Sequence, residues 1–520
     1  MKLHPKALAM HYRLKIRPGG NTAYQVIQIK ITNFITSQIP ANPMKKFAML
    51  LFAVVLFLSC SRAGENKIAP PNILFLLADD MGYGELGCYG QEVIQTPVLD
   101  GLAKKGMRFT DFYAGTSVCS PSRAVLTTGK HAGHSTIRGN NGIFEDDVWD
   151  RVPLRKDELT LGEMLTKAGY QTAFIGKWHL DDPNDISTWA MNRGFDYAVQ
   201  EQWASRFGGK AFDGLVHWIN SDRDSIRYDQ EKYDCIDEFR TDFILDYLDQ
   251  MEEDKPFFIF MSYRIPHAHE RYTRNKELYA EYGWSETERR HAARITLLDQ
   301  QIGRLLDNLE RLGVLDNTLV FFTSDNGPHH EGSHDHLFFN SAGGLRGYKR
   351  DLYEGGIREP LLVYWKDHIE PGSVTERKAA FYDIMPTLAE LSGSEVPDQT
   401  DGISLLPVLM GKETTEHEYL YFELQLDGWN RTLPDGGFRQ AIRMGKWKGV
   451  RYGIHSRTEL YDLEDDALET IDLSTQYPEI TQEINRLFLE ARTDTEGFPY
   501  GGKIQDYRAK DRYDGVLKVR

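Results

Sequence analysis

Short apolar runs alternate with amphipathic stretches along the chain from residue 71 onward. The first run, residues 72–78 (Asn-Ile-Leu-Phe-Leu-Leu-Ala), is apolar after its first residue and has the length of a strand buried on both faces. Similar runs predict strands at 172–175, 257–262 and 319–323. This alternation is typical of an α/β fold, so we expect a large, mixed but mostly parallel sheet sandwiched by helices.

Two stretches between these runs carry helix signals. At 160–168, Thr160 and Glu163 have the spacing of a capping box, and Gly169 can end the helix. At 290–312, apolar side chains recur along one helical face. These side chains are Ile295, Leu298, Ile302, Leu305, Leu309 and Leu312.

After about residue 410 the pattern changes to short strands separated by turns. The predicted elements are strands at 419–424, 439–443, 447–452 and 459–463 and a helix at 480–491. Such a series is typical of a small antiparallel α+β unit. We therefore expect a main domain at 67–410 and a C-terminal subdomain at 411–520.

The N-terminal residues differ from the rest of the chain. Residues 1–43 contain six Lys or Arg and no Asp or Glu, and they precede a better start at Met44, which indicates a mis-assigned start codon. Residues 44–60 resemble a secretory signal, with two lysines before twelve apolar residues, fewer than the ~20 that span a bilayer. Their end resembles a loose bacterial lipobox with Cys60 as the lipidated residue. We expect an exported protein of a bacterium, in the periplasm or as a lipoprotein of the outer membrane or cell surface; plain cleavage and secretion is the alternative.

Composition narrows the class of partner. Apolar residues make up 41% and charged residues 27% of the 520 residues, as in globular proteins. The net charge of −16 argues against a nucleic-acid partner. Of the four cysteines, Cys88 and Cys235 could pair in an exported protein or stay free thiols, and their spacing does not decide between the two.

Polar side chains follow four of the predicted strands. Asp79 and Asp80 come after the first strand, and Asp325 and Asn326 come after the strand at 319–323. The strands at 172–175 and 257–262 are followed by basic side chains, namely Lys177, His179 and His267. Because ligand sites of open α/β sheets lie beyond the carboxyl ends of strands, we expect these groups to converge.

A cysteine stands at the start of another predicted helix. In Cys119-Ser-Pro-Ser-Arg123, Pro121 suits the first helical position, and Gly129 suits the residue after the last turn. The group at 119 would then lie at a helix N-terminus, where unpaired N–H groups favour anions. A small buried cysteine in an ordinary helix cap is the simpler interpretation.

The run from Cys119 through Leu-Thr-Thr-Gly129 resembles the first signature of the type I, formylglycine-dependent sulfatases, an alkaline-phosphatase-like family. Residues 169–179 resemble the second signature, which supplies Lys177 and His179, and Pro266-His267 resembles a third basic element. Leu345-Arg-Gly-Tyr-Lys349 resembles the region that supplies a second lysine. The resemblance covers roughly residues 71–475 and implies that a maturase oxidises Cys119 to formylglycine.

The resemblance also implies a metal site. The family's ligands correspond to Asp79, Asp80, Asp325 and Asn326, with the converted Cys119 beside them. Carboxylate and amide oxygens suit a hard cation, and flexible coordination favours one Ca²⁺ per chain over Mg²⁺.

The resemblance further implies a mechanism. A hydroxyl of the hydrated aldehyde would attack sulfur, and His267 with Lys349 would assist the leaving oxygen. His179 would then take the proton of the second hydroxyl, which expels sulfate. Arg123, Lys177 and Lys349 would offset the charge on the sulfate group.

The resemblance, together with the signal-like residues 44–60, implies an exported, calcium-dependent sulfatase of the bacterial carbohydrate type. By analogy with the family, it would act on sulfated polysaccharides or oligosaccharides such as algal or host glycans. One alternative is a phosphomonoesterase, phosphodiesterase or phosphonate hydrolase of the same superfamily. Another is a non-catalytic glycan-binding lipoprotein, which would be expected to have lost residues of the site.

Four histidines lie within residues 329–336, directly after the Asp325 pair. They lack a fixed helical or strand spacing, so a second metal site, a solvated loop and a substrate-contact loop all remain interpretations. Their position at the expected pocket mouth favours substrate contact. The candidates for that contact are His330, His334 and His336, with His269 and, more weakly, Trp203 and Arg206 elsewhere.

Overall fold

The computed structural model describes residues 70–144, 148–202, 215–268, 277–426 and 437–501. Residues Ala69–Arg520 form one compact unit. The predicted extension, the predicted signal and Cys60 lie outside the described residues, so those interpretations stay predictions. No helix in the described ranges combines the length and the apolar character that a membrane span requires.

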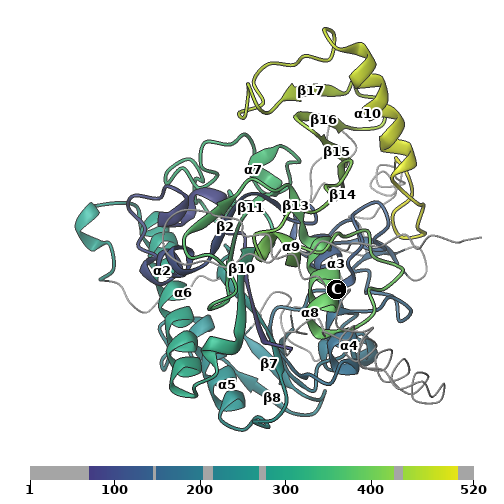
Figure 1. Cartoon of the computed structure of the whole chain (residues 1–520). Helices are drawn as coiled ribbons and strands as arrows, with labels where there is room; N and C mark the ends of the chain where they lie inside the picture. Colours follow the sequence, from purple (N-terminus) through teal and green to yellow (C-terminus); the bar gives the residue numbers. More distant parts are fainter. Residues whose placement is uncertain (1–69, 145–147, 203–214, 269–276, 427–436, 502–520) are drawn as a thin grey trace, which may run out of the picture. The chain divides into compact units, whose positions relative to one another are not determined.

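A mixed, eleven-stranded sheet forms the centre of this unit (Figure 1). Its order is β12 (Ser373–Thr375), β2 (Met107–Tyr113), β11 (Arg358–Tyr364), β10 (Thr318–Ser324), β1 (Asn72–Asp79), β9 (Phe257–Pro266), β5 (Gln171–Gly176), β6 (Tyr197–Glu201), β7 (Val216–Ile219) and β8 (Ser225–Arg227), with β13 (Ala379–Ala380) paired to β2. Strands β10, β1, β9, β5 and β6 run parallel to one another. The mostly parallel sheet is confirmed, and the four predicted strands of the main domain are β1, β5, β9 and β10.

Helices cover both faces of this sheet. They are α2 (Pro97–Lys105), α3 (Cys119–Thr128), α4 (Leu161–Lys167), α5 (Ile236–Leu248), α6 (Glu286–Arg311), α7 (Glu354–Ile357), α8 (Ile384–Ser392) and α9 (Leu406–Leu409). A short hairpin of β3 (Gly142–Phe144) and β4 (Val148–Asp150) lies outside the sheet.

Strand β1 shows why the sheet forms where the sequence is continuously apolar. Ile73, Phe75 and Leu77 pack in one cluster with α3, α4 and α8, whereas Leu74 and Leu76 pack in another with α2, α5 and α6. Burial of each such side chain contributes about 1.5–3 kcal/mol. The two clusters therefore fix both faces of the strand whose end carries Asp79.

Capping hydrogen bonds determine where two of the helices begin. Thr160 accepts a hydrogen bond from the N–H of Glu163, whose carboxylate accepts one from the N–H of Thr160, so the predicted capping box of α4 is confirmed. Helix α6 begins at Glu286, earlier than predicted, because the Ser285 hydroxyl caps it by accepting from the N–H of Glu288.

A second, four-stranded sheet follows the main one in the chain and is antiparallel throughout. It consists of β14 (Leu420–Gln425), β15 (Phe438–Met444), β16 (Trp447–Tyr452) and β17 (Glu459–Asp462), and α10 (Pro478–Glu490) packs against β15. Its apolar side chains belong to the same cluster as Ile73 of β1. The predicted antiparallel C-terminal unit is confirmed; the domain boundary at residue 410 stays a prediction.

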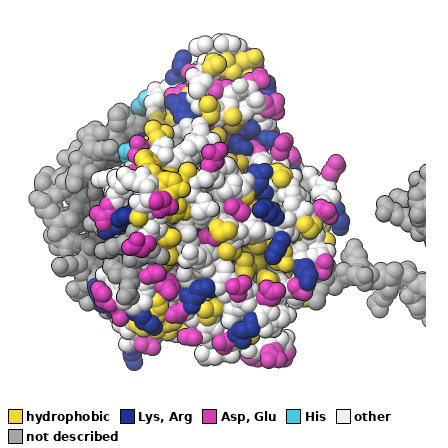
Figure 2. All heavy atoms as spheres, turned by 90° about the vertical axis from the view of Figure 1, so that its left-hand side faces the viewer, with side chains coloured by type: hydrophobic (Ala, Val, Ile, Leu, Met, Phe, Trp, Pro, Cys, Tyr) yellow, Lys and Arg dark blue, Asp and Glu magenta, His cyan; other side chains and the backbone are white. Residues whose placement is uncertain are grey.

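The described surface carries charges of both signs. Figure 2 shows acidic and basic side chains interspersed across one face, among hydrophobic and uncharged groups. The charge on that face is therefore mixed, and any attraction of an anionic ligand has to come from a local group of cations.

A buried ion cluster links the second sheet to the main one. The ammonium of Lys448 on β16 lies 2.8 Å from the carboxylate of Glu354 on α7 and 3.1 Å from that of Glu469, and all three side chains are fully buried. Glu354 also donates its N–H to Glu469 and accepts from the hydroxyl of Tyr113 on β2. The cluster thus joins both sheets through one cation.

Removal of this cation should destabilise the fold strongly. We expect Lys448→Met to lower the free energy of unfolding by about 3–5 kcal/mol, because it leaves two buried carboxylates without their partner. Denaturant unfolding measures the loss. Lys366→Met, at an exposed pair with Asp316, is the matched control and should leave the midpoint unchanged. Equal midpoints for both variants would contradict a structural role for the cluster.

Candidate active site

Charged side chains from four strand ends meet at one edge of the main sheet. Asp79 ends β1, Asp325 follows β10, Lys177 follows β5, and His267 follows β9. Each of these residues is 5% exposed or less. The predicted convergence at the carboxyl ends of the strands is therefore present in the structure.

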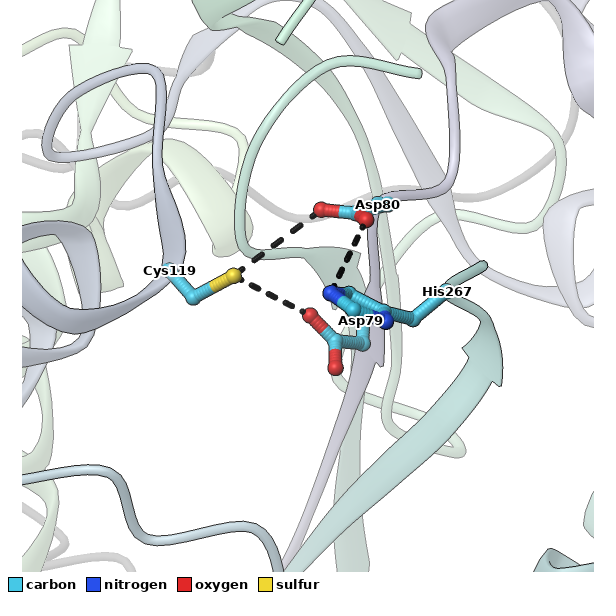
Figure 3. A group of neighbouring side chains, drawn as sticks. All are labelled: Asp79, Asp80, Cys119 and His267. Atoms are coloured by element: carbon cyan, nitrogen blue, oxygen red, sulfur yellow. Dashed lines mark hydrogen bonds and ion pairs between the residues drawn. The ribbon is translucent and has the colours of Figure 1, made fainter. Parts of the chain in front are cut away.

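The carboxylates lie against Cys119 (Figure 3). Its Sγ is 3.4 Å from Asp79 Oδ1 and 3.9 Å from Asp80 Oδ1. On the other side, His267 Nε2 lies 3.5 Å from Asp80 Oδ2. The backbone N–H of Asp80 donates to the Asp325 carboxylate at 3.1 Å, which brings the third acid into the group.

Each carboxylate has a cationic partner. Lys177 Nζ lies 2.7 Å from Asp79 Oδ2, Lys349 Nζ lies 2.7 Å from Asp80 Oδ2, and the guanidinium of Arg123 contacts Asp325 at 2.7 Å. The predicted residues of the site thus form three buried ion pairs. These pairs connect α3, the end of β5 and the segment after β10.

The balance of charge differs between the carboxylates. Burial alone would raise the pKa of Asp79, but Lys177 and Arg123 hold it below its usual value. Burial raises the pKa of Asp80 to about 7, and the neighbouring carboxylates of Asp79 and Asp325 add to the rise although Lys349 opposes it. Three cations face three carboxylates, so the difference between Asp79 and Asp80 lies in how strongly burial and the neighbouring charges act on each carboxyl.

The donor set fits a hard divalent cation. Three carboxylates and one amide supply oxygens, and Asn326 donates its side-chain N–H to Asp80 at 2.8 Å. The Asn326 Oδ1 is buried and has no hydrogen-bond partner among the described residues. An orphaned amide oxygen beside carboxylates suits Ca²⁺, which takes six to eight oxygen ligands.

Cys119 occupies the first turn of α3. The helix begins at Cys119 with Val118 as its cap, so the expectation that Pro121 takes the first helical position is wrong by two residues. Gly129, with φ of 70°, ends the helix as expected. Burial and the nearby Asp79 raise the pKa of the Cys119 thiol well above its usual value although Lys177 opposes the rise, so the group is a neutral thiol and a poor nucleophile.

Of the two predicted histidines, His267 is buried, whereas His179 is half-buried with its Nδ1 atom enclosed. Burial, with Arg151 and Lys177 nearby, lowers the pKa of His179 well below its usual value, and its Nδ1 has no hydrogen-bond partner among the described residues. A neutral imidazole with an open nitrogen can accept a proton. Its carbonyl accepts from the hydroxyl of Ser120, which ties it to α3.

The position of His267 is fixed through its backbone. Asp237 on α5 accepts hydrogen bonds from two N–H groups near the end of β9. Arg294 on α6 donates to the carbonyl of His267, and His329 lies 3.1 Å from the carbonyl of Pro266. These contacts come from α5, α6 and the segment after β10, and they fix the backbone from which the His267 imidazole reaches Asp80.

Sequence reasoning missed two residues that support the site. The Ser262 hydroxyl accepts from Arg123 at 2.5 Å and donates to the carbonyl of Lys177 at 2.7 Å. Glu331 lies 3.8 Å from Lys349 and 2.6 Å from Arg350. Ser262 ends a predicted strand and Glu331 lies among the four histidines, but only the folded chain shows what they contact.

Residues 329–336, which we call the histidine loop, have a buried inner side and an exposed outer side. His334 is buried, lies 2.5 Å from the Glu288 carboxylate and stacks on His291, so it has no surface to offer a substrate. His330 and His336 lie on the outer side. His269, Trp203 and Arg206 lie outside the described residues. Cys88 and Cys235 are free thiols.

Comparisons with known proteins match the chain to sulfatases. The family model described as Sulfatase matches residues 71–394, and one described as N-sulphoglucosamine sulphohydrolase, C-terminal, matches residues 346–494. Arylsulfatase A of Bos taurus is 32% identical over 469 residues, which cover 81% of this chain and 87% of that protein. N-acetylgalactosamine-6-sulfatase of Homo sapiens is 30% identical over 459 residues, which cover 80% of this chain and 84% of that protein.

A solved structure shows the same fold. Ps i-CgsB, determined in complex with k-i-k-neocarrahexaose, matches with a TM-score of 0.69 at 23% identity. The match covers 86% of this chain and 100% of that chain. The sheet and the C-terminal unit are therefore an arrangement already known from another protein.

Calcium should stabilise the folded chain through the oxygen donors. At a free concentration one hundred times its dissociation constant, a single bound ion adds about 2.7 kcal/mol, which raises the melting temperature. Chelation should reverse the shift. Asn326→Leu removes one donor at similar volume and should reduce the shift, whereas Asn184→Leu at an exposed position should leave it intact. A shift of the same size in both variants would contradict the assigned ligands.

Proposed function

We infer that this chain, which belongs to the sulfatase family and hydrolyses sulfate esters, acts on sulfated carbohydrates with a formylglycine made from Cys119. The observation that carries the proposal is the placement of a buried, neutral thiol against Asp79 and Asp80. A thiol is a soft group among hard oxygen donors, so the site lacks an oxygen at position 119. The hydrate of an aldehyde at that position would supply the attacking oxygen.

The metal has a defined set of protein ligands in this proposal. Asp79, Asp80, Asp325 and Asn326 would hold one Ca²⁺, with residue 119 beside them. When bound, the cation would polarise the sulfate group and add positive charge at the place where an anionic substrate binds.

The remaining roles follow from burial and charge. His267 is held by its backbone towards Asp80, where it can donate a proton to the leaving oxygen, with Lys349 beside it. His179 is neutral, and its unpartnered Nδ1 can accept a proton. Arg123, Lys177 and Lys349 are cations in place before the reaction, so they stabilise the developing charge without reorganisation.

The substrate class rests on the comparisons. One relative is named for a sulfated N-acetylgalactosamine, the C-terminal family model for a sulfated glucosamine, and the structural neighbour was solved with a neocarrahexaose. These names support a sulfated sugar as the substrate of this chain. The signal-like residues 44–60 support export by a bacterium, with Cys60 as the lipid anchor.

Release of sulfate from a glycan panel tests the proposal. Natively expressed protein should release sulfate from at least one sulfated mono- or oligosaccharide and should not release phosphate from the matching phosphate esters. A phosphatase within the same superfamily would show the reverse preference. Phosphate release faster than sulfate release would therefore reject the carbohydrate sulfatase assignment.

Substitution at position 119 tests the nucleophile. Cys119→Ala should lower sulfate release by more than about a thousandfold while leaving the melting temperature close to that of the parent, because a small buried side chain is replaced by another. Cys88→Ala, at a free thiol away from the carboxylates, is the control and should keep full activity. Substantial turnover by the Cys119→Ala variant would show that another group attacks sulfur.

A further inference from the structure

On the outer side of the histidine loop, three side chains each contribute one donor atom to a compact group. His330 Nδ1 lies 3.2 Å from His336 Nδ1, and Asp335 Oδ1 lies 3.5 Å from the first and 3.8 Å from the second. Two imidazole nitrogens and one carboxylate oxygen therefore form a small triangle. None of these three residues belongs to the carboxylate group around Cys119.

The dimensions of this triangle match a zinc site. A circle through the three atoms has a radius of about 2.0 Å, and zinc bonds to histidine nitrogen and carboxylate oxygen are about 2.0–2.2 Å long. A single ion at the centre would reach all three donors without movement of the backbone. Three protein ligands leave a position for water, as in many zinc sites.

Ring orientation separates this group from two others that also combine histidines and acids. An ion bound in the plane of two imidazole rings requires the planes to intersect close by. The rings of His330 and His336 meet at 80°. In contrast, His291 and His334 beside Glu85 stack at 12°, and His131 and His134 beside Asp401 stack at 27°.

The surrounding contacts hold the donors in place and leave them accessible. Tyr348 packs against both rings, with ring centres 5.6 Å from His330 and 4.5 Å from His336. The backbone N–H of Asp335 donates to Glu288 on α6. The side chains of His330, Asp335 and His336 are 49%, 52% and 12% exposed, so an ion from solution can reach them.

We propose that His330, Asp335 and His336 bind a divalent transition metal of the zinc type on the outer side of the histidine loop. Nitrogen donors favour zinc over calcium, so this site and the oxygen site select different ions. The bound ion would join the two ends of the loop that carries Glu331, which contacts Lys349 and Arg350. The bound ion would thus stiffen the segment that contacts Lys349, although its own binding does not require the sulfatase reaction.

Direct binding of Zn²⁺ tests the proposal. Titration calorimetry on the full-length protein in excess Ca²⁺ should show one zinc site of micromolar affinity. His330→Ala and His336→Ala should each weaken it about tenfold or more. His134→Ala, at the stacked pair, and His455→Ala, at an exposed position, are matched controls and should bind zinc like the parent. Co²⁺ should give a visible absorption band that His336→Ala loses.

Three results would overturn the proposal. These are the absence of zinc binding by the parent up to millimolar concentration, unchanged binding in His330→Ala, and loss of binding in His134→Ala alone. If His330→Ala raised KM for a sulfated glycan while zinc binding stayed the same, the loop would be a substrate contact and not a metal site. Melting temperatures of the metal-free variants, which should equal that of the parent, check that the fold is retained.

Discussion

The structure of the site depends on the balance of charge around three buried carboxylates. Removing charged groups from water is costly unless they are paired. Here each acid is paired with one cation, namely Arg123, Lys177 or Lys349. These pairs also connect elements that are far apart in the chain. Burial and the neighbouring acids nevertheless raise the pKa of Asp80 to about 7, so the pairing with Lys349 does not fully offset the cost of burying this carboxylate. A divalent cation among the oxygen donors would stabilise the charged form of this carboxylate.

The scaffold explains why that balance can be held. Strand β1 is packed on both faces, so the carboxylates at its end cannot move apart without opening two apolar clusters. In addition, Lys448 of the second sheet pairs with Glu354, which lies five residues after Lys349 in the chain. The C-terminal unit therefore supports the segment that supplies one of the three cations of the site. Fold and site are stabilised by the same kind of interaction, a buried ion pair.

Much of this arrangement could be predicted, and the exceptions have physical reasons. Continuous apolar runs identified β1, β5, β9 and β10, and strand ends located the polar groups. The start of α3 was misplaced because Pro121 suits several positions of a first turn, and the cap, Val118, has no side-chain signal. The histidine loop has no regular period, so the sequence could not show that His334 turns inward to Glu288 while His330 turns outward. Such contacts depend on long-range packing.

The central claim is that residue 119 acts as an aldehyde and not as a thiol. Mass spectrometry of the tryptic peptide 109–123 from natively expressed protein measures this directly. The account predicts that, in protein that releases sulfate, the peptide carries formylglycine, with a mass below that of the cysteine form and the change located at position 119. An unmodified cysteine throughout a preparation that is fully active would contradict it.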